Sequence, residues 1–404
     1  EYLTEESSIN FSYENRNSDH VYESLKDKDL IFFTGGDQER LQSVLRDEEV
    51  FTKAGEAIKE FYEDGGALAG TSAGAAIMSD PSISGKESHE ALSKDLEMCP
   101  GMGFLEHGIV DQHFLKRGRI GRLATALLKT GRRHGYGIDE NTALKVRDGK
   151  MEVLGESGVV VMDIDGAEEL RYENQERGLR DARVHYLTSG DIFDFIKNEI
   201  TVHPDKKPPH GENTVENPAY DGECLSEEIF ECDDVEELIK GITDNVYEET
   251  EGYSYKEKEE SVVEEEGGVK LTFSRDEKTD GYFGRRINGK EGKYWTALNL
   301  NMDIEHLGKE VIDTREVDSR ESWDRERPKG TLFLIGGALE SDNSEVYKSM
   351  LGTAVSEVPK IGVVAAASRL PTEASKEVVD VISETYGVPE DAIEIIPLSA
   401  KYSE

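Results

Sequence analysis

The sequence predicts an α/β protein built on a parallel β-sheet with helices on both faces. Short apolar runs at residues 30–33, 67–69, 332–335, 361–365 and 393–396 alternate with helix-like stretches at residues 56–63, 344–355 and 372–386. Strands of a parallel sheet are buried on both faces, so they carry unbroken apolar runs. Neither end of the chain has enough such strands alone, so we expect both ends to share one sheet.

Later segments predict additional strands. Residues 153–154 and 159–162, with Gly155 and Gly158 between them, predict a β-hairpin that completes the domain, and residues 184–187 predict a further strand. Composition changes between about 200 and 325. Residues 204–209 are typical of a linker, residues 248–268 are dominated by acidic side chains, and residues 313–329 suit a connector. Strand-like runs at 269–273 and 294–300, with the hairpin signal Asn288-Gly289, predict a small β-rich appendage with few core contacts.

The motif with the most chemical content is Gly70-Thr71-Ser72-Ala73-Gly74, which follows an apolar run and precedes a small-residue segment able to start a helix. Gly-x-Ser-x-Gly between a strand and a helix forms a nucleophile elbow, which exposes a serine hydroxyl at the carboxyl end of the strand. In such a turn the backbone N–H of Ala73 points at any carbonyl that Ser72 attacks. This motif alone leaves open an ordinary glycine-rich turn with an incidental serine.

A serine nucleophile needs a base that takes its proton and a third group that orients the base. Of the nine histidines, His113 lies just after the apolar pair Ile109-Val110, where a strand is expected to end. Asp139 and Glu140 follow another expected strand, and the sequence leaves both open as the orienting acid.

The distribution of charge points to a basic site in an acidic chain. The 86 acidic and 47 basic residues give a formal net charge of −39, yet residues 112–138 contain no acidic side chain. Arg119 and Arg122 are three residues apart and would share a helix face. We interpret Arg117, Arg119 and Arg122 as a pocket for substrate carboxylates, because a guanidinium binds a carboxylate with two hydrogen bonds. A solvated helix face is the alternative.

Four motifs together resemble the cyanophycinases, which are serine exopeptidases related to aspartyl dipeptidases. The motifs are Phe33-Thr34-Gly35-Gly36-Asp37-Gln38, Gly70-Thr71-Ser72-Ala73-Gly74-Ala75, Asp111-Gln112-His113-Phe114 with Arg117, Gly118, Arg119 and Arg122, and Gly137-Ile138-Asp139-Glu140. The resemblance implies a fold like that of class I glutamine amidotransferases, with a three-layer, doubly wound, mostly parallel sheet. It also implies that Ser72 is the nucleophile, His113 the base and Glu140 the orienting acid. Gly36 would join Ala73 in binding the oxyanion, and the substrate pocket would be lined by Gln38, Asp111, Gln112, Arg117, Arg119 and Arg122.

The segments occur in a different order from that of the family. Residues 330–404 resemble the first half of the family's fold and residues 1–195 the second half. Either the chain is circularly permuted relative to the family or its numbering is rotated. We expect residues 1–195 and 330–404 to form one catalytic domain, with residues 1 and 404 close together on the surface. Residues 200–325 would then be an acidic appendage and connector.

The resemblance implies hydrolysis of cyanophycin to β-Asp-Arg dipeptides, with no metal and no organic cofactor. Cyanophycin is a polyaspartate that carries arginine on each side-chain carboxylate. The negative charge disfavours nucleic acid and anionic lipid as partners, and it suits a cationic substrate or a salty habitat. Two alternatives are an aspartyl dipeptidase of the same fold and a catalytically silent protein that binds arginine-rich polymer.

Composition sets the remaining expectations. No apolar run of 18 residues and no signal peptide is visible, so we expect a cytoplasmic protein, with secretion as the alternative. Cys99, Cys224 and Cys232 lack the spacing of metal ligands and allow at most one local disulfide. A homodimer is left open.

Overall fold

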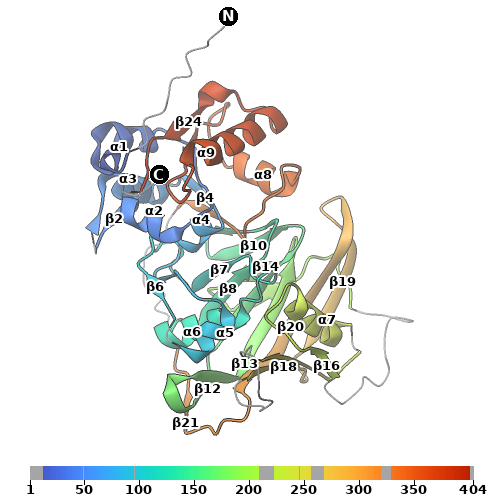
Figure 1. Ribbon diagram of the computed structural model, residues 1–404. Coiled ribbons are helices and arrows are strands. Elements are labelled where there is room, and N and C mark those ends of the chain that lie inside the picture. Colours follow the sequence, from blue (N-terminus) through green and yellow to red (C-terminus); the bar gives the residue numbers. More distant parts are fainter. Residues whose placement is uncertain are drawn as a thin grey trace, which may run out of the picture.

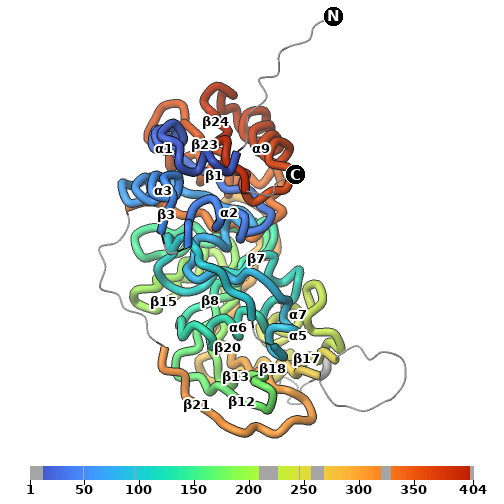
Figure 2. Tube along the Cα trace, turned by 60° about the vertical axis from the view of Figure 1, so that its left-hand side comes forward, coloured from blue at the N-terminus to red at the C-terminus, as the bar shows by residue number. Residues whose placement is uncertain are grey.

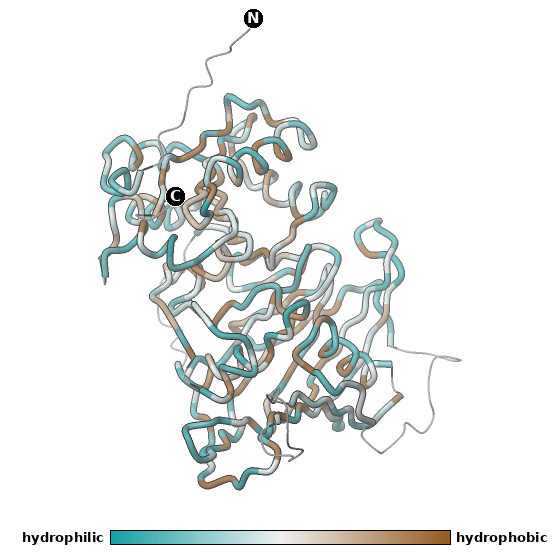
Figure 3. The backbone as a smooth tube through the Cα atoms, viewed as in Figure 1, coloured by the Kyte–Doolittle hydropathy of each residue, from teal (hydrophilic) through white to brown (hydrophobic). Residues whose placement is uncertain are grey.

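Two large β-sheets with flanking helices organise the chain, and the predicted α/β class is confirmed (Figure 1). The computed structural model describes residues 12–48, 50–94, 96–208, 223–244, 246–255, 268–319 and 329–400. The N-terminal and C-terminal segments lie side by side at one end of the molecule in both Figure 1 and Figure 2. Figure 3 shows hydrophobic residues recurring along the strands, whereas many of the turns are hydrophilic.

The first sheet has nine strands. Their spatial order is β15 (Glu199–Thr201), β14 (Ile192–Asp194), β10 (Lys150–Gly155), β9 (Thr142–Arg147), β22 (Thr331–Ile335), β4 (Ala67–Thr71), β1 (Leu30–Phe33), β23 (Ile361–Val364) and β24 (Ile393–Ile396). The five strands from β22 to β24 are parallel, and the other four join them in antiparallel pairs. The expectation of a mostly parallel sheet is therefore wrong for one half, because short turns such as Asp148-Gly149 force neighbouring strands to fold back.

The two ends of the chain share this sheet, as the apolar runs predict. Strand β22 pairs with β4 in the register Leu332↔Leu68, and β23 pairs with β1 in the register Leu30↔Ile361. Ser12 forms a parallel bridge with Leu398, so the first and last described residues approach one another. Residues 1 and 404, whose proximity the sequence predicts, lie outside the described residues.

Helices cover both faces of the parallel strands. On β1, Ile31 and Phe33 pack in one hydrophobic cluster with α1 (Asp19–Lys26), α2 (Gln38–Leu45) and α3 (Lys53–Glu63), whereas Leu30 and Phe32 pack in another with α8 (Ser344–Leu351). Successive side chains of a strand point to opposite faces, so this strand buries both. The remaining helices of the described chain are α4 (Ala73–Ala76), α5 (Ser88–Ser93), α6 (Ile120–Thr130), α7 (Asp234–Thr243) and α9 (Pro371–Asp380), which continues as a π-helical turn over Val381–Thr385. None of the helices in these ranges is long and apolar enough to cross a membrane.

The second sheet has eleven strands and is mainly antiparallel. Its principal order is β16 (Glu223–Ser226), β17 (Glu249–Tyr255), β18 (Gly268–Ser274), β20 (Lys290–His306), β13 (Arg177–Thr188), β11 (Gly158–Asp163), β8 (His134–Ile138) and β7 (Ile109–Gln112). Strand β19 (Asp280–Ile287) pairs with β20, and β12 (Glu168–Arg171) joins β13 to β21 (Asp313–Glu316). Two small two-stranded sheets are formed by β2 (Arg46–Asp47) with β3 (Val50–Phe51) and by β5 (Ser82–Ile83) with β6 (Met98–Cys99).

The predicted hairpin at residues 153–162 is wrong, although both of its strands exist. Strand β10 pairs with β9 and β14 in the first sheet, and β11 pairs with β8 and β13 in the second. The chain crosses between the sheets through the turn from Gly155 to Gly158. The hairpin signal Asn288-Gly289 does connect β19 to β20, with φ of 50° and 84° at the two turn residues.

The middle segment is β-rich, as predicted, but it is not a loosely attached appendage. Leu300, Met302 and Ile304 of β20 belong to the same buried cluster as Val160 and Met162 of β11. The prediction of few core contacts is wrong because β18 and β20 are long strands with only one buried face. Their alternation of apolar and polar residues is the same as that of an independent hairpin. Residues 256–267, which contain most of the predicted acidic stretch, lie outside the described residues.

The proline-rich segment near residue 206 is anchored rather than free. The ammonium of Lys206 lies 2.7 Å from a carboxylate oxygen of Asp191, and both side chains are fully buried. Lys206 also donates to the side chains of Thr188 and Thr296. The segment that sequence composition assigns to a linker is therefore attached to both β13 and β20.

Replacing Lys206 with Met should lower the free energy of unfolding by about 3–5 kcal/mol, because Asp191 would stay buried without its counter-charge. The neighbouring Lys207 is exposed, so Lys207→Met should cost no more than about 1 kcal/mol. Urea unfolding followed by circular dichroism measures both. Equal, small losses would show that the segment is weakly attached.

Candidate active site

Ser72 lies on a strained turn at the carboxyl end of β4. Its backbone has φ 54° and ψ −115°, a conformation that costs about 1–3 kcal/mol for a residue with a side chain. The flanking glycines have no room for side chains. A Cβ on Gly70 would lie 2.1 Å from the carbonyl oxygen of Gly74, and one on Gly74 would lie 2.6 Å from that of Phe33. The local geometry is therefore that of a nucleophile elbow.

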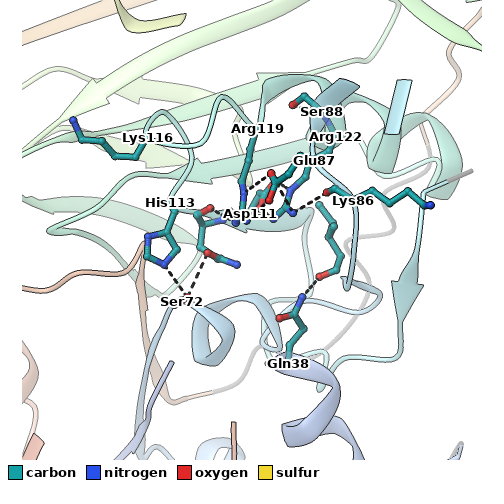
Figure 4. Close-up of polar contacts among 12 residues, drawn as sticks. Gln38, Ser72, Lys86, Glu87, Ser88, Asp111, His113, Lys116, Arg119 and Arg122 are labelled. Carbon is teal, nitrogen blue, oxygen red and sulfur yellow. Dashed lines mark hydrogen bonds and ion pairs between the residues drawn. The ribbon is translucent and has the colours of Figure 1, made fainter. Parts of the chain in front are cut away.

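Ser72, His113 and Glu140 form a hydrogen-bonded chain. Nε2 of His113 lies 2.9 Å from Oγ of Ser72, and Nδ1 lies 2.6 Å from Oε1 of Glu140. Figure 4 shows the imidazole of His113 directed at Ser72. Ser72 follows β4 of the first sheet, whereas His113 and Glu140 follow β7 and β8 of the second. The site therefore lies where the two sheets meet.

The structure separates the two acids that the sequence left open. Asp139 is buried, and its carboxylate accepts hydrogen bonds from the backbone N–H groups of Leu115 and Lys116 and from the hydroxyl of Ser157. It therefore fixes the turn that follows His113. Burial is the largest influence on Asp139 and raises its pKa. Glu140, and not Asp139, contacts the imidazole.

Three consecutive carbonyl groups at the end of β22 hold the three segments of the site. Ile335 accepts from the backbone N–H of Ser72 at 2.9 Å, and Gly336 accepts from that of His113 at 2.8 Å. Gly337 accepts from the N–H of Asn141, the residue after Glu140, at 2.9 Å. We call residues 335–337 the site spine. The C-terminal part of the chain thus positions groups that all come from the N-terminal part.

His113 is suited to accept a proton at neutral pH. Burial is the largest influence and lowers its pKa from the ordinary value of 6.5, while the hydrogen bond from its ring to Glu140 acts in the opposite direction. This direction favours the neutral imidazole at pH 7, the form in which one ring nitrogen can accept a proton.

Two backbone N–H groups beside Ser72 have no acceptor among the described residues, namely those of Gly36 and Ala73. The Gly35-Gly36 turn lies against the serine, since a Cβ on Gly35 would be 3.3 Å from Cβ of Ser72. Gly36 has φ 141° and no space for a side chain, because a Cβ there would lie 2.2 Å from the carbonyl oxygen of Ala367.

Arg119 and Arg122 are buried and already paired. Nε and Nη2 of Arg119 donate to the two carboxylate oxygens of Glu87. Its Nη1 donates to the backbone carbonyl of Gln112 at 2.8 Å. Arg122 binds both oxygens of Asp111, which is itself buried. Figure 4 shows these four side chains gathered to the right of His113. The two arginines lie side by side, as their spacing predicts. They bind Asp111 and Gln112 at the end of β7, directly before His113.

Arg117 differs from the other two arginines. It is exposed, and no described carboxylate lies within ion-pair distance of it. Partial burial, and next the positive charge of Arg119, lower the pKa of Arg117, as expected for a cation without an anionic partner. Gln112 points its amide oxygen toward Oγ of Ser72 at 3.4 Å, whereas Gln38 is buried and donates to the carbonyl of Ile83 at 2.5 Å.

Comparison with known proteins identifies the region that carries this geometry. Residues 7–154 match the model of Peptidase family S51. A cyanophycinase of Trichormus variabilis is 38% identical over 193 residues, which are 45% of this chain and 62% of that protein. A cyanophycinase of Synechococcus elongatus is 32% identical over 176 residues, which are 42% of this chain and 54% of that protein. The resemblance to cyanophycinases that the motifs indicate is therefore confirmed.

The chain spans about three fifths of the length of the curated relatives that it matches. A crystal structure of a peptidase from an acI-B1 actinobacterium is 28% identical over 37% of this chain and 59% of its own, with a TM-score of 0.31.

Sequence reasoning missed two parts of the site. Glu87 precedes a short helix in a mixed polar stretch, and nothing in its neighbourhood marks it as the partner of Arg119. For the site spine the sequence predicts only the end of a strand. The pair Gly336-Gly337 after an apolar run is nevertheless a usable signal for a close approach of the backbone to another segment. A Cβ on Gly337 would lie 2.1 Å from Cε1 of His113.

Gly337→Ala should lower kcat by about 100-fold, because the new methyl group must displace the imidazole, and misplacement by about 1 Å has an effect of that size. Gly387→Ala is the matched control. Gly387 also has a positive φ, but a Cβ there would meet no atom within 4 Å. Steady-state hydrolysis of the substrate proposed below, together with circular dichroism, measures the two effects. Normal kcat in a folded Gly337→Ala protein would contradict this role.

Proposed function

We propose that this protein is a serine exopeptidase that hydrolyses cyanophycin to β-Asp-Arg dipeptides. The observation that carries the proposal is the hydrogen-bonded chain from Ser72 through His113 to Glu140, located on a nucleophile elbow. The similarity of this region to cyanophycinases supplies the substrate class. The proposal includes both the serine-type mechanism and the polymeric substrate.

In the proposed reaction, Oγ of Ser72 attacks the aspartyl carbonyl carbon while Nε2 of His113 takes the hydroxyl proton. Glu140 accepts the hydrogen bond from Nδ1 and stabilises the imidazolium. The tetrahedral intermediate collapses, the carbon–nitrogen bond breaks, and His113 gives its proton to the departing amine. Water, deprotonated by His113, then hydrolyses the ester on Ser72 and releases the second product.

The N–H groups of Ala73 and Gly36 would hold the oxyanion of that intermediate, since both lie beside Ser72 without an acceptor in the described structure. Each such donor contributes about 3–4 kcal/mol to the transition state in measured cases. Their rigidity comes from the crowded glycines around them, so they need no rearrangement when negative charge develops.

For substrate binding we propose two groups of residues. Arg117 and Gln112 would contact substrate directly, because one is a cation without an anionic partner and the other is directed at Ser72. Gln38, Asp111, Arg119 and Arg122 would shape the pocket from behind, because their polar groups are already engaged. Substrate carboxylates would then be bound mainly by Arg117.

We further propose that residues 1–195 and 330–404 form one catalytic domain with the layering of class I glutamine amidotransferases. Helices on both faces of the parallel strands support this reading. A cytoplasmic location and a homodimer stay predictions. Incubation with insoluble cyanophycin and with α- and β-linked Asp-Arg dipeptides, followed by product identification, tests the activity and separates it from that of an aspartyl dipeptidase.

Ser72→Ala should reduce kcat by at least about 10,000-fold and leave the unfolding temperature nearly unchanged, because the elbow accepts a small side chain. The assay measures arginine-containing dipeptide released from the polymer. Calorimetric unfolding of the same preparation serves as the control for folding. Comparable turnover by a folded Ser72→Ala protein would rule out the serine mechanism.

The activity should decline in acid with a midpoint below pH 6.5, because protonated His113 cannot accept the proton of Ser72 and burial holds its pKa below the ordinary value. Glu140→Gln should shift that midpoint to lower pH as well as slow the reaction, since the contact with Glu140 raises the pKa of His113. Profiles of kcat/KM against pH test both points. A midpoint above 6.5 in the parent protein would contradict them.

A further inference from the structure

The middle segment of the chain forms one wall of a cavity next to Glu140. The cavity has a volume of about 300 Å³ and borders the carboxylate that contacts His113. Residues 116–188 and the loop after β22 supply part of its lining, and α7 and β20 of the middle segment supply the rest. Its lining includes Lys116, Glu140, Tyr186, Glu236, Trp295 and Glu340.

Two stacked aromatic rings make part of this wall rigid. The rings of Tyr186 and Trp295 have centroids 4.0 Å apart and an angle of 25° between their planes. The hydroxyl of Thr188 donates to the backbone carbonyl of Trp295 at 2.9 Å, which fixes β20 against β13. Figure 1 shows β20 and α7 beside β13 in the lower right part of the molecule.

A hydrogen bond attaches the hairpin of β19 and β20, whose second strand carries Lys293 and Trp295 of the cavity lining, to α8. At the tip of β19 and β20, Asn288 donates to a carboxylate oxygen of Glu345 on α8 at 3.0 Å. The same carboxylate accepts from the hydroxyl of Ser189 and from the backbone N–H of Gly155. Through this carboxylate the hairpin is linked to α8, to β10 of the first sheet and to the turn after β13.

The charges around the cavity favour a cationic occupant. Its lining has four carboxylates and two ammonium groups. The ammonium of Lys116 is paired with Asp233 at 2.6 Å, and the carboxylate of Glu156 is paired with Lys290. Lys293 is exposed at the rim.

Glu236 and Glu340 have no ion-pair partner within the described ranges, and the Tyr186 hydroxyl lies 3.5 Å from Oε1 of Glu236. Burial, and next the negative charges of Asp233 and Asp139, raise the pKa of Glu236, which indicates a negative potential at this position. A cation in the cavity would relieve that repulsion.

We propose that this cavity binds the guanidinium group of a substrate arginine beside the scissile bond, with Glu236 and Glu340 as its carboxylate partners. The proposal rests on the proposed function. A guanidinium is planar, presents a fork of N–H donors to carboxylates and packs on aromatic surfaces. Since Glu140 lines the cavity, its occupant lies next to the reaction centre. The middle segment thus contributes substrate recognition.

The test compares arginine with citrulline, which has the same shape but no charge. Calorimetry measures binding of a β-Asp-Arg peptide and of the matching β-Asp-citrulline peptide to the Ser72→Ala protein, which does not consume them. The Ser72→Ala protein should bind the arginine peptide at least about 10-fold more tightly than the citrulline peptide. Glu236→Gln combined with Glu340→Gln should remove that preference, whereas Glu373→Gln, on an exposed part of α9, should leave it unchanged.

A second measurement covers the case in which the double variant does not fold. The chain has two tryptophans, Trp295 and Trp323, so Trp323→Phe leaves only the one in the cavity wall. Its fluorescence should change on adding the arginine peptide and not on adding the citrulline peptide.

Equal affinity of the Ser72→Ala protein for both peptides, or a preference that survives when Glu236→Gln and Glu340→Gln are added, would overturn the proposal. Hydrolysis of cyanophycin by the unaltered protein is measured separately. If the unaltered protein does not hydrolyse cyanophycin, the proposed function is wrong, while the binding preference still decides what the cavity recognises.

Discussion

The candidate site depends on the backbone of residues 335–337. Three successive carbonyl groups bind the N–H groups of Ser72, His113 and Asn141, each at 2.8 or 2.9 Å. These three residues come from turns that follow three different strands, in two different sheets. Backbone hydrogen bonds of this length leave little freedom, so the distances among the three side chains are set by one short stretch of chain. The absence of a side chain at Gly337 leaves the space that the imidazole occupies.

Buried charge gives this arrangement a second level of support. Asp111 lies directly before Gln112 and His113, and it is held by both oxygens to Arg122. Arg119 links the carbonyl of Gln112 to Glu87. A buried carboxylate without such a partner would destabilise the folded protein, so Asp111 and Arg122 must be retained as a pair. Two cations of the positive stretch, Arg119 and Arg122, are thus part of an internal framework, whereas Lys116 and Arg117 are exposed beside His113.

The two sheets meet at the site, and each provides different groups of it. The first sheet provides the serine on a parallel strand, with helices on both faces, and the second provides the imidazole and the carboxylate. The middle segment extends the second sheet and shares its hydrophobic cluster, so it is part of the structure that holds the site. Its strand β20 and helix α7 also bring Trp295 and Glu236 to the cavity that Glu140 lines, and both residues lie outside the matched region of residues 7–154.

The sequence by itself determined the α/β class, the parallel strands at both ends of the chain, the elbow around Ser72 and the choice of His113. These features are local. An unbroken apolar run or a Gly-x-Ser-x-Gly turn has the same meaning wherever it occurs, because it follows from burial or from steric limits within a few residues. Motif resemblance added Glu140, which spacing alone could not separate from Asp139. Only the tertiary structure decided that Asp139 binds backbone N–H groups, that Arg119 and Arg122 are already paired, and that residues 153–162 divide between two sheets. It also decided that Lys206 is buried and that the middle segment joins the core. Each of these depends on which distant segment supplies the partner, and partners such as Glu87, Asp191 and Gly337 carry no local signal of the residue that they will meet.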